Sequence, residues 1–224
     1  MTMSSSEPAP VKPVVTLFET YGAGASYVGP RVAQALGLPF HRQAFSSEQL
    51  EAEEERREKE SLLSRVFSAM GPGYAGPEGG AVPVAQQDRY ELAVENTRIV
   101  QEEAAQGGVV MGRNGAVILA GRPASLHVLL DGPVEQRVAR AAEETGIARE
   151  RAARRQKRED EVRAQMSQDL YGWDPRQPHR YDMVLNTGSL SLDECVAIIV
   201  DAVRVRAGQV PGPAAAAPAA APPG

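Results

Sequence analysis

The chain has a single cysteine among its 224 residues, and its apolar residues never form a long uninterrupted run. One cysteine cannot form a disulfide within the chain, and the apolar helical pattern around Cys195 predicts a core position for it. No stretch reaches the roughly 18 apolar residues of a membrane span, so we expect no transmembrane helix. The first residues lack the charged and apolar regions of a signal peptide, and a cytoplasmic location is therefore expected.

Strong positive charge and metal-binding patterns are also missing. The formal net charge of −5 argues against a nucleic-acid surface as the main partner. No His/Cys cluster has the spacing of a metal site, and no Ser–His–Asp arrangement is evident. The chemistry must therefore be sought in glycine turns, arginines and isolated carboxylates.

The most informative stretch is an apolar run followed by a glycine turn and a helical pattern. Residues 14–18 are apolar and mostly β-branched, as a buried parallel strand requires. Glycines at 22 and 24 break the run, and Gly37 ends the helical pattern that follows. A strand, a glycine turn and a helix N-terminus aim backbone N–H groups and a positive helix end at one place. Such a place suits phosphate.

This turn has the form of a P-loop without its lysine. The motif GxxxxGK[ST] requires a lysine and a hydroxyl directly after its second glycine. Aligned on Gly24, the chain has Glu19 at the first glycine, Ala25 at the lysine and Ser26 at the hydroxyl. Two of the four chemical parts are present. A glycine turn that opens a helix in any α/β protein is the plain structural alternative.

Four segments, in order, resemble a known family. The first, ETYGAGASYVGPRVAQALGLPF, is similar to the pattern SREYGSGGREIGRRLAEKLGIPF of the cytidylate kinase-like proteins, which are relatives of the nucleoside monophosphate kinases. The others are VVMGRNGAVILAGRPASLHVLLDGPVEQRVAR, EDEVRAQMSQDLYGWD and YDMVLNTGSLSLDECVAIIVDAV. The resemblance implies phosphoryl transfer from ATP to a nucleoside monophosphate, CMP or dCMP. It also implies nucleotides as partners and leaves a protein partner unspecified.

The pattern of the whole chain predicts an α/β fold. Strands are expected to begin near residues 14, 39, 109, 125 and 183, with residues 14–18 away from the sheet edge. Helices are expected at 134–145, from 148 to about 168 and at 192–206. We expect a three-layer P-loop nucleoside-kinase fold, with a five-stranded, mainly parallel sheet, helices on both faces and a helical lid. The domain should span residues 14–207, between disordered tails at 1–13 and 208–224. A charged helix from residue 46 and a Gly/Pro-rich loop should lie between the second and third strands.

The resemblance implies roles for residues that follow the strand ends, where ligands bind in such sheets. The phosphate-binding residues would be Gly22, Ala23, Gly24, Ala25, Ser26, Tyr27 and Arg137. Arg113 would bind the acceptor phosphate with its planar fork, or else pair with a carboxylate of the Glu-rich helix expected after residue 46. Arg140, Asp160 and Arg163 would be catalytic, the last two in a lid that closes over the phosphates. A merely solvated helix of mixed charge is the alternative for the lid.

ATP and Mg²⁺ are the cofactors that the resemblance implies, with Ser26 as the candidate metal ligand. Ala25 lacks the ammonium of a P-loop lysine, and Glu19 would repel phosphate unless it points away or meets a cation. The chain is therefore either a phosphotransferase or a nucleotide-binding sensor with little catalysis. We expect Ala25→Lys to raise transfer and Gly24→Val to fill the space of the phosphate. We also expect Arg163→Ala to weaken turnover without changing the melting temperature.

Overall fold

One parallel sheet organises the chain. The computed structural model describes residues 11–42 and 86–207; most of both tails and the helix and loop expected after residue 46 lie outside the described residues. The strands lie in the order β2-β3-β1-β4-β5, and every pairing between neighbours is parallel. They are β1 Val14–Glu19, β2 Phe40–His41, β3 Gly108–Met111, β4 Ser125–Asp131 and β5 Met183–Asn186. The predicted five-stranded sheet, with residues 14–18 away from its edge, is confirmed.

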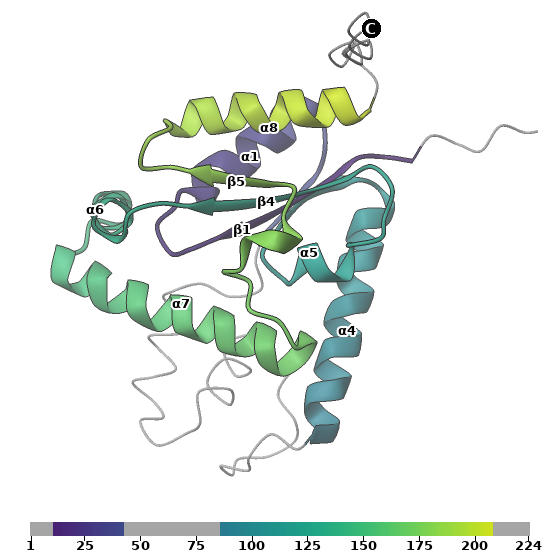
Figure 1. Ribbon diagram of the computed structural model, residues 1–224, viewed down its shortest axis with the longest axis horizontal. Helices are drawn as coiled ribbons and strands as arrows, with labels where there is room; N and C mark the ends of the chain where they lie inside the picture. Colours follow the sequence, from purple (N-terminus) through teal and green to yellow (C-terminus); the bar gives the residue numbers. More distant parts are fainter. Residues whose placement is uncertain (1–10, 43–85, 208–224) are drawn as a thin grey trace, which may run out of the picture.

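Helices cover both faces of the sheet (Figure 1). On one face lie α1 (Ala25–Leu36) and α8 (Leu192–Arg206), which pack against each other. On the other lie α4 (Gln86–Ala105), α5 (Gly115–Ile118) and α7 (Arg149–Tyr171). Helix α6 (Val134–Thr145) lies beyond the arrowheads of the strands, and the 3-10 turn η1 (Pro178–Arg180) precedes β5. The expected three-layer α/β class is confirmed.

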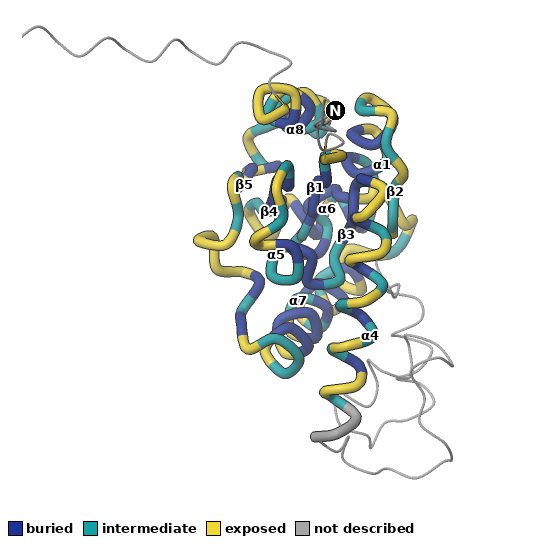
Figure 2. Tube along the Cα trace, turned by 90° about the vertical axis from the view of Figure 1, so that its right-hand side faces the viewer, coloured by how far each residue is buried: buried dark blue, intermediate teal, exposed yellow. Residues whose placement is uncertain are grey.

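The core is densest around β1, because this central strand has a neighbour on each side and helices above and below (Figure 2). Alternate residues of a strand point to opposite faces. Val15 and Leu17 pack toward α1 and α8, whereas Val14 packs with Val100 in a second cluster under α4. Cys195 is fully buried in the first cluster, as its helical pattern predicts. Each such fully buried apolar side chain contributes about 1.5–3 kcal/mol to folding.

Local sequence signals explain the ends of the helices. Helix α8 begins with a capping box in which the Ser191 hydroxyl accepts from the Glu194 N–H and the Glu194 carboxylate accepts from the Ser191 N–H. Helix α7 continues to Tyr171, a few residues past the predicted end, because Gly172 is the first residue there to adopt a left-handed conformation (φ 67). Within the part of the chain that is described, no helix has the length and apolarity needed to cross a membrane.

Candidate functional site

The loop between β1 and α1 has the tight backbone that its glycines predict. Gly22 and Gly24 have φ angles of 78° and 98°, a region that side-chain-bearing residues rarely adopt. A Cβ on Gly22 would overlap the carbonyl oxygen of Arg137, and a Cβ on Gly24 would lie 2.6 Å from Leu192 Cδ2. The space beside Gly24 is therefore filled by α8. The expectation that Gly24→Val adds bulk where phosphate sits is wrong, because the added atoms meet Leu192 instead.

Ala25 is fully buried in the core cluster beneath the first turn of α1. Its side chain therefore points into the protein and away from any ligand at the loop. A lysine at this position would carry its ammonium into an apolar environment, which is costly. The structure thus contradicts the expectation that Ala25→Lys would restore a phosphate contact, and any cation at this loop must come from another element.

A carboxylate already occupies the N-terminus of α1. Glu19 is the last residue of β1, and its Oε2 accepts hydrogen bonds from the N–H groups of Gly24 (3.0 Å) and Ala25 (2.8 Å). Burial raises the pKa of the Glu19 carboxyl above its usual value, although Arg163 and the Ala25 N–H act in the opposite direction. The Glu19 side chain thus points toward the loop. Its carboxyl group is the acceptor that the two N–H groups bind.

Four other donors in and beside the loop also donate hydrogen bonds to carboxylates. The Tyr21 N–H donates to Asp160 Oδ1 at 2.7 Å, and the Ser26 hydroxyl donates to Glu144 Oε1 at 2.6 Å. The remaining two pairs are Thr20 Oγ1 with Asp131 at 2.6 Å and the Tyr27 hydroxyl with Asp193 at 2.8 Å. The loop is therefore ringed by negative charge contributed by α6, α7, α8 and the end of β4.

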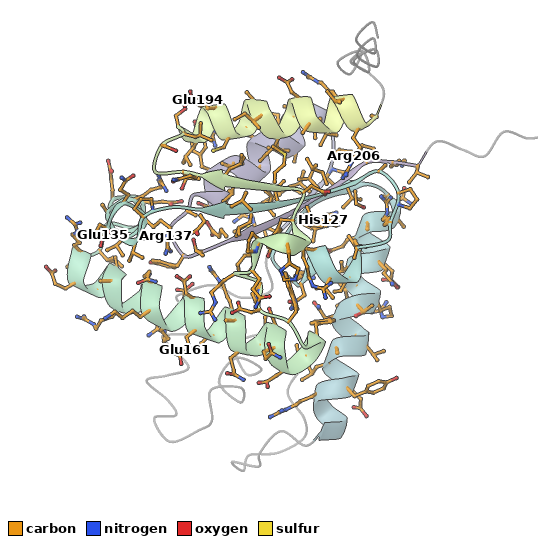
Figure 3. All side chains as sticks on the ribbon, in the orientation of Figure 1. His127, Glu135, Arg137, Glu161, Glu194 and Arg206 are labelled. Atoms are coloured by element: carbon orange, nitrogen blue, oxygen red, sulfur yellow. The ribbon has the colours of Figure 1, made fainter. Side chains whose placement is uncertain are left out.

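The two arginines predicted on α6 lie against the same loop. Arg137 is buried and donates to the carbonyl oxygen of Tyr21 at 2.8 Å (Figure 3). Arg140 donates to the carbonyl oxygens of Gly22 (2.9 Å) and Thr187 (2.6 Å). Their spacing of three residues puts both on one helical face, as predicted. In this conformation both guanidinium groups hold the backbone of the loop in place.

The two predicted residues of α7 approach the loop from the face of the sheet opposite α1 and α8. Asp160 accepts from the Tyr21 N–H, and one turn later Arg163 donates to the carbonyl oxygen of Glu19 at 3.3 Å. Arg163 also pairs at 3.0 Å with Glu159, whose side chain is fully buried. A buried ion pair is costly to break. This burial contradicts the expectation that Arg163→Ala would leave the melting temperature unchanged.

Arg113 follows the neighbouring strand β3, but its side chain turns away from the loop. Its Nη1 lies 3.4 Å from Glu103 of α4, and its Nε donates to the carbonyl oxygen of Arg42. Its carboxylate partner thus comes from α4, and the Glu-rich segment expected to offer one lies outside the described residues. The backbone of Arg113 and Asn114 is nevertheless strained, with φ angles of 54° and 59°.

A clamp of side chains holds this strained pair. The Trp173 indole donates to Asn114 Oδ1 at 3.0 Å, so Asn114 precedes α5 without capping it through its side chain. The Asn96 amide donates both to the carbonyl oxygen of Arg113 (3.0 Å) and to the Tyr171 hydroxyl (2.7 Å). Tyr171, the last residue of α7, and Trp173 just after it thus anchor that helix to the β3–α5 turn.

A polar cleft of about 820 Å³ opens beside the loop, along one face of α7. Its lining includes Thr20, Asp131, Arg137, Gln156, Asp160 and Arg176. Gln156 is not recognisable from the sequence, because a single amide in a basic helix carries no signal of its own. The spacing of Gln156, Asp160 and Gln168 in multiples of four residues does put these polar side chains on one helical face. Of the predicted site residues, Arg137 and Asp160 line this cleft.

Comparison with known proteins agrees with these features. Residues 14–189 match the model of the cytidylate kinase-like family. The chain belongs to the cytidylate kinase-like family. It is 28% identical over 199 residues to a cytidylate kinase of Methanopyrus kandleri, a match that covers 85% of this chain and 92% of the relative. Family membership and sheet topology together establish the expected α/β P-loop kinase fold.

Two further matches differ in reach. The chain is 36% identical over 111 residues to a uronate isomerase of Corynebacterium glutamicum. This match covers 50% of the chain and 21% of the relative, so the chain spans about a fifth of the length of that protein. The crystal structure of an uncharacterized protein from Eubacterium ventriosum superposes with a TM-score of 0.61 at 15% identity, over 86% of this chain and 98% of the other. At this identity the superposition supports the fold alone.

Proposed function

We propose that this cytidylate kinase-like protein transfers a phosphoryl group from ATP to a nucleoside monophosphate, CMP or dCMP. The observation that carries the proposal is the carboxyl oxygen held at the N-terminus of α1. Two N–H groups there donate to Glu19 Oε2, and paired donors at a helix N-terminus are the arrangement that binds phosphate oxygens. The loop residues therefore fit the phosphates of a donor nucleotide, whose oxygens would take the same two N–H groups.

Mg²⁺ would be held by oxygen atoms from the start of α1 and the end of α6. The Ser26 hydroxyl and Glu144 Oε1 are 2.6 Å apart, and hard cations prefer hydroxyl and carboxylate oxygens. No group of three or more His, Cys, Asp or Glu side chains suited to a metal exists among the described residues. The cation would therefore be held by the Ser26 hydroxyl, the Glu144 carboxylate and the phosphates of the nucleotide itself. When bound, ATP and Mg²⁺ supply the transferable group and neutralise part of its charge.

The arginines supply the positive charge that Ala25 lacks. The positive charge of Arg163 favours the charged form of the Glu19 carboxyl group, to which the Ala25 N–H donates. A cation from α7 therefore lies close to this end of α1. Arg140 lies over Gly22 on the other side of the loop. Charge fixed around the transferring group is the main requirement of phosphoryl transfer. We assign this role to Arg140 and Arg163, with Arg137 binding the donor and Asp160 holding Arg137 and the loop in place.

The acceptor would occupy the polar cleft beside the loop, whose volume is in the range of small-molecule sites. Arg113 follows the neighbouring strand β3 and does not line this cleft, so it would bind the acceptor phosphate only after its side chain leaves Glu103 and turns toward the cleft. The competing function, a nucleotide sensor without catalysis, rests on the absence of a P-loop lysine. The presence of Arg163 and Arg140 at the loop weakens that alternative.

The proposal is tested with the full chain and a panel of nucleotides. Thermal-shift measurements should show stabilisation by ATP with Mg²⁺ and by CMP or dCMP, because binding to the folded state raises its stability. A coupled assay should then detect ADP formed only when the monophosphate is present. A folded protein that binds none of these nucleotides would refute both functions, whereas binding without transfer would favour the sensor.

A further inference from the structure

We propose that Glu19 is an internal competitor for the donor phosphates and sets the affinity of the loop for them. Its carboxylate holds the two N–H groups that a phosphate would need, so donor binding requires this side chain to leave. This inference rests on the proposed function only in taking the loop as the donor phosphate site. It concerns a residue at the position of the first P-loop glycine, where a side chain is not expected.

The geometry of the contact is that of a bound ligand. One oxygen, Glu19 Oε2, accepts from two successive N–H groups, at 3.0 Å from Gly24 and 2.8 Å from Ala25. Both donors lie at the positive end of a 12-residue helix. Charge-assisted hydrogen bonds to such an end stabilise an anion, whether it belongs to the chain or to a ligand. The same arrangement that recommends the loop for phosphate therefore stabilises the occupied state.

The groups around Glu19 make its hold on the loop incomplete. Burial and the carboxylates of Glu144 and Glu159 disfavour its charge, whereas Arg163 and the Ala25 N–H favour it. The Glu19 residue is only partly buried. Its carboxylate can therefore exchange the two N–H groups for solvent and the Arg163 guanidinium. A phosphate brings more charge to the same donors and can displace it.

The consequence is a reduced apparent affinity for phosphates. When only a fraction of molecules has the binding-competent loop, the apparent dissociation constant rises by the inverse of that fraction. If about one molecule in ten has Glu19 displaced, removal of the carboxylate should strengthen binding about tenfold. This gain in affinity should depend on removal of the Glu19 carboxylate and should not follow from a general loss of negative charge.

The test uses inorganic tripolyphosphate, without Mg²⁺ or nucleoside, as the probe for the loop. Its affinity is measured by titration calorimetry for the wild type, Glu19→Ala and Glu19→Gln. Glu19→Ala should bind about tenfold more tightly than the wild type, since the competitor is gone. Glu19→Gln, which keeps the shape but loses the charge, should show a smaller gain in the same direction and serves if Glu19→Ala folds poorly.

A matched control separates competition from net charge. Glu143→Ala removes an exposed charge from α6. It should change tripolyphosphate affinity much less than Glu19→Ala. The backbone ¹H–¹⁵N signals of Gly24 and Ala25, read without ligand, should shift in the Glu19 variants and stay in place in Glu143→Ala.

Each outcome decides the matter. Equal affinity of wild type and Glu19→Ala, an equal gain in Glu143→Ala, or unmoved Gly24 and Ala25 signals would overturn the role of Glu19. No tripolyphosphate binding by any variant would overturn it together with the proposed function. A gain in Glu19→Ala without transfer to any nucleoside monophosphate would refute the proposed function alone, whereas transfer by the wild type without such a gain would refute the competition alone.

Discussion

At the scale of single residues, the stability of the site depends on a few buried charges. Arg163 has a side chain 9% exposed and pairs with Glu159, which is fully buried. Removal of one partner of such a pair leaves the other charge in a poorly solvated place. Any effect of Arg163 on the proposed transfer is therefore coupled to folding, and its variants must be measured for both activity and stability.

Arg163→Ala should lower the free energy of unfolding by on the order of 3 kcal/mol. Arg98→Ala is the matched control, because Arg98 forms ion pairs with Glu95 and Glu102 on the exposed face of α4. It should change stability far less, since exposed pairs contribute little. Urea denaturation of both variants gives the comparison, and equal losses would contradict the buried pairing.

His127 gives the folding equilibrium a dependence on pH. It lies in β4 with Nδ1 2.8 Å from Thr16 Oγ1 (Figure 3). Burial lowers its pKa below the ordinary value of 6.5, with a smaller contribution in the same direction from Arg206 and an opposite one from Asp182. The unfolded chain therefore binds the proton more readily than the folded protein.

This contribution to stability should be fully present above pH 6.5 and be lost as the pH falls from there through the lower folded pKa. His127→Gln removes the titrating group while keeping a side chain that can hydrogen-bond to Thr16. The unfolding free energy of the wild type should fall more steeply between pH 7 and pH 5 than that of the variant, when both are measured by urea denaturation. Parallel profiles would show that His127 does not carry this dependence.

At the scale of elements, α8 packs directly against the β1–α1 loop. Leu192, in the first turn of α8, fills the space beside Gly24, and the Ser191 capping box fixes where that turn begins. The loop thus depends on a helix about 170 residues further along the chain. A substitution at Gly24 acts through this contact as well as through its φ of 98°.

Gly24→Ala should destabilise the protein by about 2 kcal/mol, from backbone strain and from overlap with Leu192. Leu192→Ala removes the overlapping atoms at its own cost in packing. The double variant should lose less stability than the sum of the two single ones, because the shortened side chain makes room for the methyl group. Strict additivity in urea denaturation would contradict the contact.

The elements themselves could be predicted from sequence, for identifiable reasons. The bounds of α6 and α8 agree with the prediction because Pro133 and Gly146, and the Ser191 box, mark them chemically. Strand β2 has only two residues, Phe40 and His41, and pairs with β3 alone at the edge of the sheet. A pattern of alternation cannot be recognised in so short a segment.

At the scale of the whole molecule, the sequence indicated which residues meet but not what they touch. The arginines of α6 and α7 do reach the β1–α1 loop, since right-handed crossovers bring successive strand ends to one edge. Their partners, by contrast, are carbonyl oxygens and carboxylates of this chain. The contact of Glu19 with Gly24 and Ala25 depends on the turn geometry, which spacing alone does not define.

The central claim is that these arginines surround a phosphoryl-transfer site, and Arg140 tests it most directly. Its guanidinium contacts the loop from a partly exposed position, so its removal should spare the core. The measurement is the steady-state rate of CMP- or dCMP-dependent ADP formation for the wild type, Arg140→Ala and the control Arg98→Ala. The account predicts that kcat falls about 100-fold or more in Arg140→Ala and is unchanged in Arg98→Ala. Equal rates in wild type and Arg140→Ala, with both proteins folded, would contradict it.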